Sequence, residues 1–193
     1  MLVGAFYLNS EPGSSTKDRN YYFDANGKLQ DWSYPLDSSK ANNRYVNRNI
    51  RKDGHNGIDI SSYLEEPIYN VTGGTVLFSG WYQSVPTDSK SGTGNTVIIK
   101  TDTNPVLYVR YFHMHKKPVP ITNTHISAGD DIGLVGNTGF STGKHLHLDV
   151  SELKTISANG NPSTLNPEDA KNPAAFFPYI NFTGDRAFGA DLN

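Results

Sequence analysis

The sequence contains no cysteine, which excludes disulfides, thiolate metal ligands and a cysteine nucleophile. It also lacks a basic excess: the formal net charge is −2, so no charge imbalance favours a nucleic acid as partner. No apolar run approaches the ~18 residues of a membrane-spanning helix, and residues 1–10 lack the charged and long apolar regions of a signal peptide. We therefore expect no membrane span, and a metal ion here would need His, Asp or Glu ligands.

Turn-forming residues are abundant, since the 193 residues include 18 Gly and 11 Pro. This composition predicts many turns and little helix, with Pro167–Phe177 as the best short helix because Asn166 can cap it. Short segments with strand character follow one another from residue 57 onward. They are Ile58–Ile60, Thr75–Phe78, Thr96–Lys100, Leu107–Met114, Ile132–Val135 and His145–Val150. The fold class predicted is mainly β, with an antiparallel sheet or an open, strongly curved one.

The chain divides into three expected parts. Residues 1–45 form an N-terminal arm or hairpin, residues 46–155 form the core, and residues 156–193 form a C-terminal segment that packs on the core. Residues 83–94 are predicted to be a loop between two strands, of the kind that often borders a binding groove.

Histidines gather in this sequence in a way that strand geometry makes informative. In the strand His145–Val150 the period of two places Leu146, Leu148 and Val150 on one face, which we expect to be core. His145, His147 and Asp149 then lie on the opposite face. His55 stands an even number of residues before Asp59, so these two side chains can share a side as well.

Two imidazoles and one carboxylate form the ligand set of a catalytic zinc site that keeps a fourth position open. Spacing alone does not choose between His145 and His147, because residues two apart on one strand can both reach one ion. A phosphate-binding loop over residues 138–145 is excluded, since Thr138 and His145 stand where that motif needs Gly and Ser or Thr. The His-Glu-x-x-His and Gly-x-Ser-x-Gly motifs are both absent from the sequence.

Three segments of the sequence closely resemble, in content and in order, the motifs of the lysostaphin-type zinc metallopeptidases, which are also called β-lytic or glycyl-glycine endopeptidases. These segments are Gly54–Ile60, Tyr111–Met114 and Gly136–Leu148. The resemblance covers roughly residues 50–150. It implies a curved antiparallel sheet with one Zn²⁺ per chain in a groove. The implied zinc ligands are His55, Asp59 and His147.

The same resemblance assigns His113 and His145 to catalysis, sharing between them proton transfer from water and stabilisation of the oxyanion. Tyr45 is the nearest candidate for the tyrosine that stabilises the transition state in members of this family. The segment Tyr45–Arg48 departs from the family's usual Phe/Tyr-Gly-x-Arg motif, because Val46 stands in place of the glycine. His115 and His125 match no family position, and we interpret both as surface residues.

The activity implied is that of a zinc-dependent endopeptidase that hydrolyses cross-bridge or stem peptides of bacterial peptidoglycan. One alternative is a non-catalytic module of the same fold that binds cell wall or regulates amidases. Another is a zinc-held structural domain of a phage tail or spore assembly. We expect a monomer or a domain of a larger protein, located outside the cell, in the cell wall, or on a virion.

Overall fold

The protein was analysed as a computed structural model, which describes residues 32–39, 46–47, 55, 57–82, 85–152, 170–171 and 173. No α-helix occurs within these ranges, so none of the described chain could cross a membrane as a long apolar helix. The strands found there are β1 (Val46–Asn47), β2 (Ile58–Ser61), β3 (Pro67–Tyr69), β4 (Gly74–Tyr82), β5 (Gly94–Thr101), β6 (Tyr108–Met114), β7 (His125–Ile126), β8 (Asp131–Leu134), β9 (His145–Ser151) and β10 (Ala170–Lys171).

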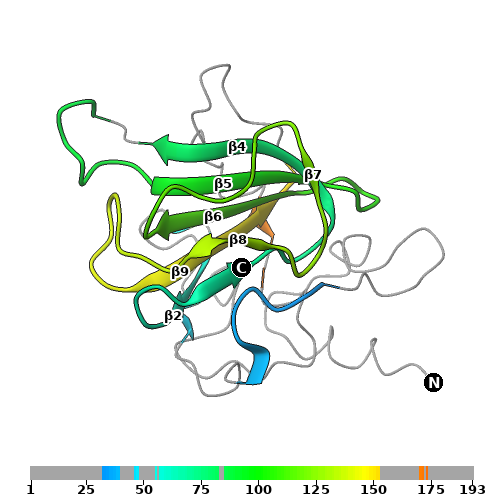
Figure 1. Ribbon diagram of the computed structural model, residues 1–193, viewed down its shortest axis with the longest axis horizontal. Coiled ribbons are helices and arrows are strands. Elements are labelled where there is room, and N and C mark those ends of the chain that lie inside the picture. Colours follow the sequence, from blue (N-terminus) through cyan, green and yellow to red (C-terminus); the bar gives the residue numbers. More distant parts are fainter. Residues whose placement is uncertain are drawn as a thin grey trace, which may run out of the picture.

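One large antiparallel sheet dominates the described part of the chain (Figure 1). Its strands are ordered β1-β2-β9-β6-β5-β4-β7, and β10 pairs with β9 beside this path. Strand β9, close to the end of the described chain, therefore lies between β2 and β6 and joins segments that are far apart in sequence. This placement sets His147 of β9 beside Asp59 of β2 on one side and beside Phe112 of β6 on the other.

The alternation of side chains decides which face of the sheet is buried against the core. Ile58 and Ile60 of β2 and Leu146, Leu148 and Val150 of β9 are fully buried and belong to one apolar cluster. A second, two-stranded sheet of β3 and β8 contributes Ile68 and Ile132 to the same cluster. Burying this face leaves the opposite face of β2 and β9 for polar side chains.

The predicted mainly β, antiparallel fold is confirmed, and each predicted strand segment overlaps an observed strand. Residues 85–93 form turns between β4 and β5, as the predicted loop requires. Trp32 and Leu36, within the range expected to be an arm, are buried in the core cluster. Most of that arm and most of residues 156–193 lie outside the described residues.

The predicted helix over Pro167–Phe177 is wrong where the structure describes this range. Ala170–Lys171 forms strand β10, which pairs with Ser151 and Val150 of β9. A capping residue and a proline at the first turn suit a helix locally, but an adjacent strand offers unpaired backbone groups that stabilise an extended segment.

Candidate metal centre

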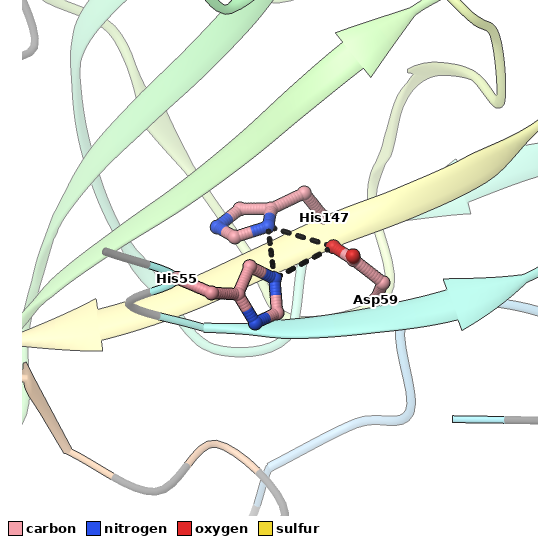
Figure 2. Close-up of side chains that lie close together, drawn as sticks. All are labelled: His55, Asp59 and His147. Atoms are coloured by element: carbon pink, nitrogen blue, oxygen red, sulfur yellow. Dashed lines mark hydrogen bonds and ion pairs between the residues drawn. The ribbon is translucent and has the colours of Figure 1, made fainter. Parts of the chain in front are cut away.

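Three side chains converge on the face of the sheet opposite the core (Figure 2). Asp59 on β2 is the register partner of His147 on β9, so the pairing of these two strands sets the two side chains side by side. His55 precedes β2 and turns its ring toward the same point. The donor atoms of the three residues lie within 4.8 Å of one another.

The contacts within this set are short and directed. Nδ1 of His147 lies 2.8 Å from Oδ1 of Asp59, and Nε2 of His55 lies 3.1 Å from the same oxygen. These two ring nitrogens are 3.2 Å apart. Two imidazole nitrogens and one carboxylate oxygen, all aimed at one point, match the ligand set of a catalytic zinc site. The residues present therefore fit the metal that the sequence predicts.

The charges of the set are strongly coupled. Burial alone would raise the pKa of Asp59, but hydrogen bonds from His147 and His55 lower it well below its usual range. Burial likewise opposes the charged form of His147, but the neighbouring carboxylates of Asp149 and Asp59 raise the pKa of its ring to about 9. Asp59 is thus ionised at neutral pH, and in the metal-free protein His147 holds a proton that a metal ion has to replace.

This proton predicts how zinc binding depends on pH. Zinc takes only the neutral imidazole, so below about pH 9 each ion bound must displace a proton from His147. We expect the apparent zinc dissociation constant to fall by up to about tenfold per pH unit between about pH 6.5 and about pH 8. Competition with a chelator of known affinity measures it. A dissociation constant that stays constant over this range would contradict the assignment of His147.

Two further histidines stand beside the three donors. Nε2 of His145, at the start of β9, lies 3.4 Å from Oδ1 of Asp59. The ring centroid of His113, near the end of β6, lies 4.9 Å from that of His145 and 6.1 Å from that of His147. The structure therefore brings together five of the predicted site residues, namely His55, Asp59, His113, His145 and His147.

Backbone carbonyls orient the rings of His113 and His145 in the same way. Nδ1 of His113 lies 2.8 Å from the carbonyl oxygen of Thr138, and Nδ1 of His145 lies 2.8 Å from that of Gly143. A carbonyl only accepts hydrogen bonds, so each Nδ1 carries the proton and each neutral ring keeps a lone pair on Nε2. Burial, followed by the charges of His147 and His145, lowers the pKa of His113 to about 3. His113 is therefore neutral at pH 7.

His113 reaches this position through an unusual backbone conformation. Its φ is 63°, in the left-handed region that is uncommon for residues other than Gly. Regular alternation would place His113 on the core face with Tyr111. The left-handed turn breaks that alternation after Phe112, the last β6 residue in register with β9, and the ring lies near His145 instead.

The loop that holds His113 is itself tightly packed around Thr138. The hydroxyl of Thr138 donates to the carbonyl of Met114 and accepts from the backbone N–H of Asn95. Gly94 packs against the backbone of Thr138 and Gly139, and a Cβ added to either glycine would lie within 3 Å of backbone atoms. Both glycines also have φ near +70°. Sequence reasoning missed Thr138, since no spacing rule identifies a residue that acts through its carbonyl.

The other predicted residues lie apart from this cluster. His115 contacts Glu65 at 2.9 Å, and His125, more than half exposed, contacts Asp102 at 2.7 Å. Tyr45 lies outside the described residues, so its predicted role stays a prediction. Phe112 and Arg110, which the sequence reasoning did not single out, share the site face with His147, and strand alternation could have found them.

The protein is thus an antiparallel β-sheet protein with a His-Asp-His donor set that could hold a metal ion, and such a set is the kind of ligand set found in zinc hydrolases. Comparison with known sequences agrees with this class, because residues 53–164 match the profile of Peptidase family M23. This chain belongs to that family, which confirms the resemblance found in its motifs.

Individual relatives support the same assignment. The chain is 31% identical over 138 residues to "Peptidoglycan DD-endopeptidase ShyA" of Vibrio cholerae, covering 67% of this chain and 30% of that protein. It is 30% identical over 147 residues to an "Uncharacterized metalloprotease" of Buchnera aphidicola, covering 76% of this chain and 35% of the relative. The matches thus span about a third of these relatives' length.

Among solved structures, the catalytic domain of the antimicrobial peptidase lysostaphin from Staphylococcus simulans shares the fold. The superposition has a TM-score of 0.55 at 23% identity, covering 73% of this chain and 97% of that domain. At this identity the likeness concerns the fold, and the chemistry has to be argued from the residues of this chain.

Proposed function

We propose that this chain is a zinc-dependent endopeptidase that hydrolyses peptide bonds in bacterial peptidoglycan, within a cross-bridge or a stem peptide. The observation that carries the proposal is the convergence of five side chains. His55, Asp59 and His147 offer three metal ligands, and His113 and His145 present Nε2 lone pairs beside them. Membership of Peptidase family M23 and the similarity to a peptidoglycan endopeptidase support the choice of substrate class.

The proposed roles divide between holding the metal and moving protons. His55, Asp59 and His147 hold the zinc ion, which when bound polarises a peptide carbonyl and makes water more acidic. His113 and His145 offer Nε2 lone pairs, one of which accepts the proton of the attacking water, and the Nε2–H formed in this way can donate to the negatively charged carbonyl oxygen. Their Nδ1–H bonds to the carbonyls of Thr138 and Gly143 keep each ring from rotating while a proton arrives at Nε2.

Reversible inactivation by a chelator tests the proposal directly. We expect purified cell walls to release peptide fragments with the native protein, to release none after a strong chelator has removed the metal, and to release them again when zinc is returned. Magnesium, which prefers oxygen ligands, should not restore the activity and serves as the control.

Mass spectrometry of the fragments from walls with glycine bridges and from walls with direct cross-links would identify the bond that is cut. If the zinc-loaded protein bound to cell walls but released no peptide fragments, this result would contradict the proposal and favour a non-catalytic binding module.

A further inference from the structure

A buried ion pair lies directly behind His147, on the side of its ring away from Asp59 and His55. Arg110 on β6 and Asp149 on β9 are register partners on adjacent strands. Nε of Arg110 donates to Oδ1 of Asp149 at 2.6 Å, and both side chains are almost completely buried. A buried ion pair is a poor source of stability, because removing both charges from water costs about as much as their attraction returns. Its presence beside the donor set therefore calls for a functional reason.

The second carboxylate oxygen of Asp149 faces the imidazole. Oδ2 is buried and makes no hydrogen bond among the residues that the structure describes. It lies 3.5 Å from Nε2 of His147, slightly beyond a good hydrogen bond. A buried carboxylate oxygen without a partner is costly, and a small approach of the ring would satisfy it. The geometry matches an Nε2–H that points at Asp149 while Nδ1 points at Asp59.

Other neighbours hold the His147 ring in this plane. Phe112 stacks on it with an interplanar angle of 4° and a centroid distance of 5.1 Å, and the guanidinium of Arg110 lies 5.2 Å from the Phe112 centroid. Gly57 lies on another side, where an added Cβ would be 2.7 Å from Nε2 of His147 and 2.8 Å from Cβ of Asp149. Side-chain packing thus restricts the rotation of the ring.

We infer that Asp149 is a positioning residue for the metal site, and that it acts through His147. The carboxylate accepts the Nε2–H of His147 and so fixes the tautomer whose Nδ1 lone pair faces His55 and Asp59. Arg110 holds Asp149 in place through its 2.6 Å bond to Oδ1, which leaves Oδ2 facing the imidazole. A carboxylate behind a ligating imidazole also makes the ring a better metal ligand. This inference rests on the proposed function, because it requires that His147 ligates zinc.

The test compares zinc affinity in Asp149→Asn with that in the wild type, by chelator competition at one pH. We expect the variant to bind zinc about 10- to 100-fold more weakly, the range for loss of a partner behind a metal ligand. Glu66→Gln is the matched control, since Glu66 is equally buried but interacts with Ser62 and the backbone N–H of Asp37. It should leave the zinc dissociation constant unchanged.

Equal zinc affinity in Asp149→Asn and the wild type would overturn the inference while leaving the proposed function intact. A similar loss of affinity in both variants would overturn it too, because the effect would then be a general consequence of neutralising a buried carboxylate. A wild-type protein that binds no zinc would instead refute the proposed function and the inference together.

A measurement on the wild type alone keeps the inference testable if Asp149→Asn does not fold. In ¹⁵N-resolved NMR spectra of the zinc-loaded protein, we expect His147 to carry its proton on Nε2 and none on Nδ1. Coordination through Nδ1 by itself leaves a proton on Nε2, so the sign of the role of Asp149 is a downfield shift of that proton, which reports its hydrogen bond to the carboxylate. A purely structural ion pair would leave the Nε2–H at the shift of a ring N–H without such a bond. A proton on Nδ1, or coordination through Nε2, would overturn the inference.

Discussion

His147→Ala is expected to retain no stoichiometric zinc and to release no fragments from cell walls. His147 supplies one of three donor atoms within 4.8 Å of one another, so its loss leaves His55 and Asp59 as a two-ligand set. Zinc binding contributes to the free energy of folding, so the melting temperature in the presence of zinc should fall as well. Asp59→Ala should lose zinc for the same reason, because Asp59 contacts both histidines.

Metal content, melting temperature with and without zinc, and wall hydrolysis would be measured on the same preparations. His125→Ala is the matched control, because this exposed histidine pairs with Asp102 away from the donor set and should change none of the three. A folded His147→Ala or Asp59→Ala protein with one zinc ion per chain would refute this ligand set.

The second large effect concerns catalysis without loss of metal. His145→Ala should keep its zinc and nearly its full stability, while turnover on cell walls falls by about 10²- to 10⁴-fold, the range for a positioned acid or base. Nε2 of His145 lies 3.4 Å from Oδ1 of Asp59, and its Nδ1 donates to the Gly143 carbonyl. His145 therefore lies beside the three metal donors and is not one of them.

His113 should behave in the same way, but alanine would be strained at a φ of 63°. His113→Asn is the better variant because asparagine tolerates the left-handed region. If His145→Ala lost the metal while His147→Ala kept it, the roles of the two β9 histidines would be reversed. Loss of zinc from both would mean that His145 is a fourth ligand.

Several features followed from local sequence because strand geometry is local. The period of two in His145–Val150 separated Leu146, Leu148 and Val150, which belong to the apolar cluster, from His147, which is also buried but lies on the opposite face beside Asp59. The same reasoning paired His55 with Asp59, whose side chains are in contact. The helix expected over Pro167–Phe177 was wrong at Ala170–Lys171, because a distant strand, β9, decides the conformation of that segment.

By itself, then, the sequence determined the fold class, six of the strands in the described chain and the residue types available to bind a metal, since alternation and spacing depend only on neighbouring residues. Only the tertiary structure decided that β9 lies between β2 and β6, which sets His147 between Asp59 and Phe112. It also turned His113 out of its strand's alternation, and it paired Arg110 with Asp149 behind His147. These arrangements depend on register between strands remote in sequence, and the local pattern fixes the face that a residue occupies but not the residue that stands opposite it on a remote strand.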